Sequence, residues 1–144
     1  ELIASFEAAV KAYPTDLSHY GALNRRLRER LGRMEDVYIN SPDNSVDNIL
    51  SFSVLGVRSE IMLHSLEEHD IFVSSGSACS KGKISSVPDS FGLSADRADS
   101  TIRVSFSMET TEDDIDRLAD EIENGIARFR RTKSKSRAKK GNDI

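Results

Sequence analysis

The stretch that decides the fold spans residues 48–73 and reads NILSFSVLGVRSEIMLHSLEEHDIFV. Its first eight residues are dense in apolar and β-branched side chains, which predicts a strand that Gly56 ends. Ser59 can then cap a helix through about His69. The β-branched and aromatic run 71–73 predicts a second, buried strand. A strand, a helix and a strand in this order are typical of a crossover unit, whose connection packs on one face of a sheet.

Periodicity, capping residues and turn residues predict the other elements on both sides of this stretch. In chain order they are a helix over 1–13, a helix from Thr15 or Asp16 through Met34, a strand over 36–40, a short helix over 86–92, a strand over 101–106 and a long helix from Thr110 or Thr111 to about Arg131. We therefore expect an α/β or α+β layer fold, in which a short sheet carries helices mainly on one face.

The strand over 101–106 alternates apolar with polar residues, so it is expected to be half-buried. Ile102 and Val104 fall on its apolar side, and Arg103 falls on its polar side. In the second helix the charged residues 24–30 are expected to face water, which is the usual role of such residues on an amphipathic helix. The helix that begins at residue 1 has no cap ahead of it and is expected to be cut from something longer.

Length and composition favour one globular body and a tail. With 144 residues, of which 38% are hydrophobic, the chain can build a single modest core, which we assign to residues 1–131. Residues 132–144 are basic and carry no large apolar residue before the last position, so we expect a disordered tail that does not bind nucleic acid directly. No apolar run is long enough for a membrane span, and a single cysteine favours a reducing compartment, by default the cytoplasm.

That cysteine, Cys79, lies among small polar residues in the stretch SSGSACSKGK over 74–83. A thiol in such a loop directly after a strand could be a nucleophile, a sulfur or redox carrier, or a residue without chemistry. A catalytic pair with a histidine is a competing possibility, although sequence places none of His19, His64 and His69 beside it. No cluster of residues has the spacing of a metal site.

Residues 48–130 resemble the C-terminal part of the NifS/IscS-like cysteine desulfurases, pyridoxal phosphate (PLP) enzymes of the class V aminotransferase group. Two pieces together make the resemblance specific, namely Ser74-Ser75-Gly76-Ser77-Ala78-Cys79 and Ser100-Thr101-Ile102-Arg103. The similar pieces around them are Asn48 to Ser53, Gly56 to Glu60, His64 to Glu68 and Thr111 to Asp116. The resemblance implies the small C-terminal domain of a fold-type I PLP enzyme.

In this family a cysteine thiolate attacks the sulfur of PLP-bound L-cysteine, which leaves L-alanine and a protein persulfide. The resemblance assigns the persulfide to Cys79 and the substrate carboxylate to Arg103. It also implies a homodimeric enzyme that passes sulfur to an acceptor protein for iron–sulfur cluster assembly or tRNA thiolation. The family binds PLP through a larger domain that comes earlier in the chain, and neither its Schiff-base lysine nor a Gly-rich phosphate cradle has a counterpart here. We therefore expect the isolated chain to bind no PLP and to be inactive by itself.

Other functions remain open at this point. The chain could be a stand-alone sulfur carrier or interaction module, which would have no need of Arg103, or the domain of a selenocysteine lyase. It could also be a structural domain with an inert thiol.

Overall fold

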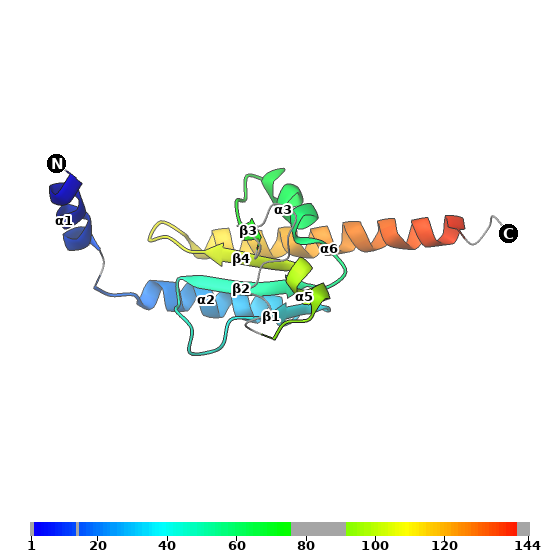
Figure 1. Ribbon diagram of the computed structural model, residues 1–144, viewed down its shortest axis with the longest axis horizontal. Helices are drawn as coiled ribbons and strands as arrows, with labels where there is room; N and C mark the ends of the chain where they lie inside the picture. The colour runs from blue at the N-terminus through cyan, green and yellow to red at the C-terminus, as the bar shows by residue number, and fades with distance from the viewer. Residues whose placement is uncertain (1, 14, 76–91, 141–144) are drawn as a thin grey trace.

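The computed structural model describes residues 2–13, 15–75 and 92–140, with side chains described through Phe129. Four strands form one sheet, α1 stands apart from it, and α6 extends beyond it (Figure 1). No helix within these ranges is both long enough and apolar enough to cross a membrane. In chain order the elements are α1 (Leu2–Ala12), α2 (Ser18–Leu31), β1 (Val37–Ile39), β2 (Ile49–Val54), α3 (Ser59–Glu67), β3 (Ser74–Ser75), α5 (Ala95–Asp99), β4 (Thr101–Ser105) and α6 (Glu112–Lys140).

The sheet has the strand order β1-β2-β4-β3, and every neighbouring pair is antiparallel. Because β2 and β3 both run antiparallel to β4, they run parallel to each other, and α3 connects them as the crossover predicts. β4 lies between these two strands although it follows both in sequence. The expected α+β fold, a short sheet with helices mainly on one face, is confirmed.

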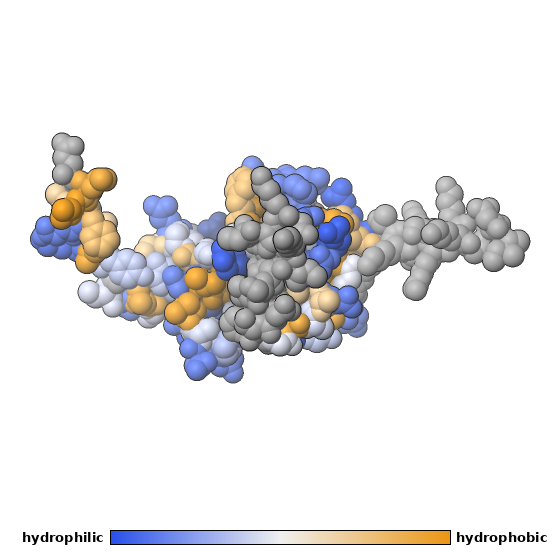
Figure 2. Space-filling model, viewed as in Figure 1, coloured by the Kyte–Doolittle hydropathy of each residue, from blue (hydrophilic) through white to orange (hydrophobic). Residues whose placement is uncertain are grey.

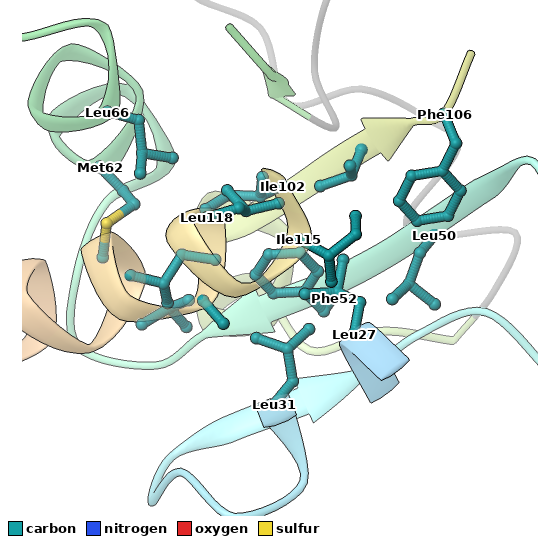
Figure 3. Packing of buried hydrophobic residues seen from close by; sticks show 14 of the residues in the cluster. Leu27, Leu31, Leu50, Phe52, Met62, Leu66, Ile102, Phe106, Ile115 and Leu118 are labelled. Carbon is teal, nitrogen blue, oxygen red and sulfur yellow. The ribbon is translucent and has the colours of Figure 1, made fainter. Parts of the chain in front are cut away.

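The hydrophobic core lies between the sheet and the helices α2, α3 and α6 (Figure 3). Alternation along β2 and β4 points every second residue at these helices, and each of these residues is buried. The apolar stripes predicted for the second and the last helix are confirmed in their central parts. The fully buried large side chains are Leu23, Leu27 and Leu31 of α2, Leu50, Phe52 and Val54 of β2, Met62 and Leu66 of α3, Ile102 of β4, and Ile115 and Ile122 of α6.

Helix α1 makes no part of this core. Every one of its residues is exposed, including Leu2, Ile3 and Phe6, whose exposed fractions are 89%, 84% and 72%. The orange side chains of α1 in Figure 2 therefore stand on a helix that is separate from the body. The following helix, expected from Thr15 or Asp16 through Met34, instead spans Ser18–Leu31 with Leu17 at its N-cap. Just ahead of it, Oδ1 of Asp16 accepts a hydrogen bond of 2.9 Å from the backbone N–H of Ser18. This hydrogen bond lowers the pKa of Asp16.

The strand predicted at residues 71–73 is wrong by a few positions. Ladder pairing with β4 begins at Ser74, which lies opposite Arg103. Ile71 and Val73 do pack against the core, whereas Phe72 between them is 78% exposed. Residues 71–73 thus alternate between partly buried and exposed side chains, as in a strand, but their backbone does not pair with β4. The apolar run is therefore the segment that precedes β3. The predicted short helix over 86–92 lies outside the described residues except for its last glycine.

Helix α6 begins with a reciprocal capping arrangement. The hydroxyl of Thr111 accepts a hydrogen bond from the backbone N–H of Asp114 at 3.2 Å, and the Asp114 carboxylate accepts from the Thr111 N–H at 2.8 Å and from its hydroxyl at 2.7 Å. These contacts from Thr111 lower the pKa of Asp114. The cap predicted at Thr110 or Thr111 is therefore made by Thr111. The helix continues through Lys140, so no break in secondary structure marks residue 132, and the boundary at 131 stays a prediction.

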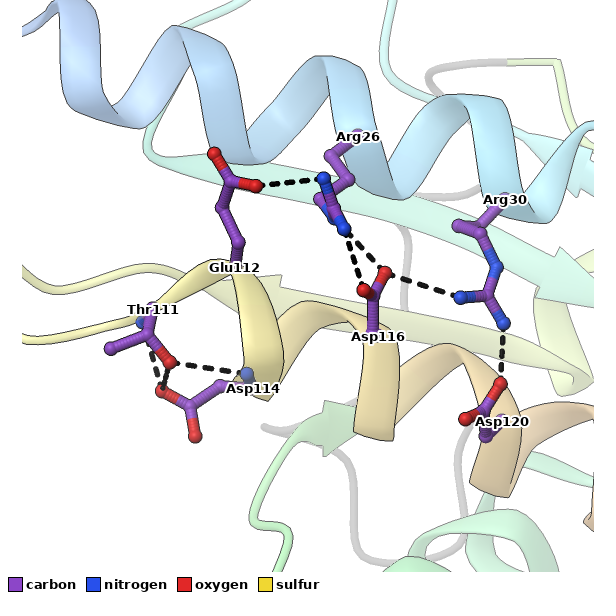
Figure 4. A network of polar contacts seen from close by, with 7 residues as sticks. All are labelled: Arg26, Arg30, Thr111, Glu112, Asp114, Asp116 and Asp120. Carbon is purple, nitrogen blue, oxygen red and sulfur yellow. Dashed lines mark hydrogen bonds and ion pairs between the residues drawn. The ribbon is translucent and has the colours of Figure 1, made fainter.

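The charged face of α2 is not simply solvated, which corrects the expectation for residues 24–30. Arg26 holds Asp116 of α6 through two hydrogen bonds, at 3.0 Å from Nε and 2.6 Å from Nη2 (Figure 4). Arg30 contacts the same carboxylate at 3.1 Å and also pairs with Asp120. A further hydrogen bond of 2.7 Å joins Arg26 to Glu112. The sequence could not show this network, because its acids lie about 90 positions away from its arginines.

The network makes the stability of the fold depend on pH. The hydrogen bonds from Arg26 lower the pKa of Asp116, so its contribution to stability is present above the unfolded pKa of about 3.9 and is lost as the pH falls through the folded value. We expect Asp116→Asn to lower the urea midpoint at about pH 7 and the difference from wild type to shrink toward about pH 3. The exposed Glu123→Gln is the control and should change little. A difference for Asp116→Asn that stays constant over this range would contradict the electrostatic origin.

Candidate functional site

The candidate site is the face of the sheet opposite α2 and α6. β4 places Ile102 and Val104 in the core and leaves Arg103 exposed on the other face, as the alternation predicts. The same alternation in β2 brings Ser51 and Ser53 to this face. We call it the polar face.

One end of the polar face is closed by hydrogen bonds beneath α5. The hydroxyls of Ser53 and Thr101 lie 3.0 Å apart, and each donates to the carbonyl oxygen of Arg97, at 2.8 and 2.7 Å. The Asn40 amide donates to Ser53 at 2.9 Å and accepts from Arg97 Nη2 at 2.5 Å. Ser53 and Thr101 are buried and hydrogen-bonded here, which fastens α5 to the sheet, whereas the buried Nε of Arg97 has no hydrogen-bond partner among the described residues.

Arg97 also lies over an aromatic ring. Its guanidinium carbon is 5.3 Å from the centre of the Tyr38 ring on β1, which is cation–π distance. Ser94 caps α5, because its hydroxyl accepts from the backbone N–H of Arg97 at 3.4 Å. These contacts set the point at which the chain returns to β4 after residues 76–91.

The other end of the polar face is open and is centred on Arg103. Arg103 lies opposite Ser51 on β2 and opposite Ser74 on β3, so one residue from each of three strands forms a row. Within the residues that the structure describes, none of these three side chains has a hydrogen-bond or ion-pair partner. Arg103 is exposed and the two serines are partly exposed, so a ligand could reach all three.

Cys79 itself lies outside the described residues, so its placement beside Arg103 stays a prediction. β3 ends at Ser75, four positions before it. The three histidines have contacts elsewhere: His19 with the carbonyl oxygen of Thr110 at 2.9 Å, His64 with Glu67 at 3.0 Å and His69 with Glu121 at 3.3 Å. In the described part of the chain no group of His, Cys, Asp and Glu could hold a metal ion.

The described residues do not fit PLP as its main binding site. The cofactor needs a lysine amine for its imine and donors for its phosphate. Lys11 is the lysine whose side chain the structure describes, and it is paired with Glu7 at 2.6 Å on the separate helix α1. None of the side chains described on the polar face supplies that amine. We therefore derive no chemical step through the cofactor.

The fold and this site can now be compared with known proteins. Residues 7–118 match the family model of aminotransferase class-V. The chain therefore belongs to the aminotransferase class-V family. Solved structures with the same fold include a NifS-like protein from Rickettsia africae, with a TM-score of 0.64 and 25% identity over 74% of this chain and 28% of that one. A second NifS-like protein gives a TM-score of 0.67 at 25% identity, over 76% of this chain and 28% of that one.

Curated relatives point to one branch of the family. The cysteine desulfurase IscS of Pseudoalteromonas translucida is 36% identical over 130 residues, which are 88% of this chain and 32% of the relative. The cysteine desulfurase IscS of Vibrio vulnificus is 37% identical over 129 residues, 88% of this chain and 31% of the relative. The resemblance to NifS/IscS-like desulfurases is thus confirmed. The chain spans about a third of the length of these relatives.

Sequence reasoning missed two parts of the polar face. It did not single out Arg97 as the centre of the closed end, because no motif connects it to Asn40 and Ser53. It also did not single out Ser51 and Ser74, whose position beside Arg103 depends on strand register. The one available signal was the serine at every second position of the strand over 48–55, which marks a polar face.

Proposed function

We propose that this chain is the C-terminal region of a PLP-dependent cysteine desulfurase. In the proposed reaction the sulfur of L-cysteine is transferred to Cys79, which gives L-alanine and a Cys79 persulfide. The carbon–sulfur bond of the substrate breaks as a sulfur–sulfur bond forms with Cys79. Substrate and thiol together contain all the atoms of the two products, so the reaction needs no external oxidant or reductant.

The position of Arg103 is the observation that carries this proposal. An exposed guanidinium on an inner strand, without a partner among the described side chains, is suited to hold the substrate carboxylate through two parallel hydrogen bonds. A sulfur carrier without chemistry of its own would have no need of such a group. The identities of the curated relatives, all named cysteine desulfurase IscS, support the same reaction.

The position of Cys79 in the chain supports its role as the sulfur acceptor. Ser75 pairs with Ile102, the residue next to Arg103. Four further residues of chain span at most about 14 Å, so the proposal requires no longer reach than the chain between Ser75 and Cys79 allows. A thiol that attacks sulfur reacts best when its pKa lies close to the ambient pH.

Several further properties belong to the same proposal. The PLP would be bound by residues outside this chain, since the described residues lack the lysine that it needs. The persulfide sulfur would pass to an acceptor protein for iron–sulfur cluster assembly or tRNA thiolation, and the enzyme would be a homodimer in the cytoplasm. The single cysteine of the chain is consistent with a reducing compartment.

The test is to assemble the enzyme from this chain and the remaining two thirds of the Pseudoalteromonas translucida relative, loaded with PLP. We expect L-cysteine to yield L-alanine and, in equal amount, one added sulfur on Cys79, read by mass spectrometry of the peptide that contains it. Cys79→Ser should abolish both products while PLP absorbance is retained.

Two controls make the result interpretable. The unmodified relative shows that the assay works, and this chain alone with PLP should form no L-alanine. L-alanine formed by Cys79→Ser at the wild-type rate would refute the role of Cys79, and L-alanine formed by the isolated chain would refute an external cofactor site. A PLP-loaded assembly that forms neither product would refute the desulfurase proposal.

A further inference from the structure

We propose that Ser51 and Ser74 complete a three-donor carboxylate site with Arg103 and determine how the substrate is oriented, an inference that rests on the proposed function. Both serines are direct cross-strand neighbours of Arg103, Ser51 on β2 and Ser74 on β3. Directly opposed residues in an antiparallel pair have their Cβ atoms about 4.5–5.5 Å apart and point to the same face. The two hydroxyls therefore flank the base of the arginine side chain on either side.

The contrast between the two ends of the polar face shows that this row is not a structural network. At the closed end, Ser53 and Thr101 are buried, lie 3.0 Å apart and both donate to the Arg97 carbonyl oxygen. Two ladder positions further along, the side chains of Ser51, Arg103 and Ser74 have no partner among the described residues. Polar groups that bond to one another stabilise the fold, whereas a row of free donors is available to a ligand.

The chemistry of the row selects an anion. Arg103 contributes only donors, and each hydroxyl can donate one hydrogen bond. The neighbours of the row along β2 and β4 on this face are Ile49, Ser53, Thr101 and Ser105, and Asn40 lies beside Ser51; none of them is acidic. A cation would be repelled by the guanidinium, while a planar carboxylate can take two hydrogen bonds from it and still accept others on its remaining lone pairs.

The hydroxyls add orientation to the charge of Arg103. A carboxylate held only by an exposed arginine can pivot about the long flexible side chain. Additional donors from the strands on both sides define the plane in which the carboxylate lies, and so the direction in which the rest of the amino acid projects. Hydrogen bonds to a charged group are stronger than those between neutral groups, so the loss of one should be measurable as about tenfold weaker substrate binding.

The experiment compares Ser51→Ala and Ser74→Ala with Ser105→Ala in the assembled PLP-loaded enzyme described above. Ser105 lies on the same face of β4, but it is opposite Ile49 and outside the row, so it is the matched control. We expect each variant of the row to raise the KM for L-cysteine about tenfold with kcat retained, and Ser105→Ala to change neither. Calorimetric binding of the product L-alanine, which has the same carboxylate, should weaken by the same factor, and Ser74→Thr should restore it.

The outcomes separate this inference from the proposed function. If both serine variants bind L-alanine and turn over L-cysteine as wild type while Arg103→Met is impaired, the three-donor site is refuted and the desulfurase proposal stands. If Arg103→Met is also unimpaired, the proposed function itself fails. Urea unfolding of this chain serves as the folding check, since replacing a partly exposed serine by alanine should leave the urea midpoint close to that of wild type.

Discussion

Replacing Arg103 by methionine is expected to raise the KM for L-cysteine about 100-fold in the assembled desulfurase. The guanidinium would make two charge-assisted hydrogen bonds to the substrate carboxylate, and their loss together costs about 3 kcal/mol of binding, or roughly two powers of ten. Arg103 is exposed and has no partner in the described part of the chain, so its removal leaves no other buried group unsatisfied. The measurement is steady-state L-alanine production as a function of L-cysteine concentration.

Two further variants test the reason for this effect. Arg103→Lys keeps the charge but loses the planar pair of donors, so an intermediate rise of about tenfold is expected. Arg33→Met removes an exposed arginine in the turn that follows α2 and should leave KM unchanged. If Arg103→Met changed the KM no more than Arg33→Met does, this chain would not hold the substrate carboxylate. A sulfur carrier that catalyses no reaction of its own would then be the better explanation.

Replacing Phe52 by alanine is expected to lower the free energy of unfolding by about 3–5 kcal/mol. Phe52 is fully buried in the middle of β2, opposite Ile39 on one side and Ile102 on the other (Figure 3). Alanine would leave a cavity beneath the helices that the rigid ladder could not close. The free energy of unfolding of a whole domain is only about 5–15 kcal/mol, so this change is expected to leave a substantial part of the protein unfolded. Urea denaturation followed by circular dichroism measures it.

Phe72→Ala is the matched control for this change. It removes the same number of atoms from a side chain that is 78% exposed, so the expected change is within about 0.5 kcal/mol. If both variants lost the same free energy of unfolding, the core described above would be contradicted. A buried Phe52 would then stabilise the fold no more than an exposed Phe72 does.

The parts of the fold that the sequence predicted are those in which a local pattern determines the outcome. The alternation around Arg103 correctly placed that residue opposite the core, and the periodicity that predicted the second helix reflects the burial of Leu23, Leu27 and Leu31 on one of its faces. The strand at 71–73 was misplaced because side-chain composition reports burial, whereas a ladder requires a backbone partner. The partner of Arg26 could not be predicted, since it is fixed by how α2 packs on α6.

The residues of the candidate site also fall into those that a local sequence pattern identifies and those that depend on the three-dimensional arrangement. Motif resemblance identified Arg103 and Cys79, each of which lies within a distinctive local stretch. Ser51 and Ser74 lie within the pieces that resemble the family, but their position beside Arg103 appears only when the register of three strands is known. The position of Cys79 relative to Arg103 remains a prediction, which the persulfide experiment addresses.

The position of β4 has a consequence for the order in which the chain can assemble. β4 is the last strand to be synthesised, yet it occupies an inner place, so β2 and β3 cannot meet in one ladder until it arrives. A chain that ends before Thr101 leaves both strands with an unpaired inner edge, the kind of edge that invites aggregation. The stretch with Cys79 is made before that closing strand, and Arg103 is carried on it. During biosynthesis Cys79 is therefore made before Arg103, and the proposed carboxylate site can form only once β4 has completed the sheet.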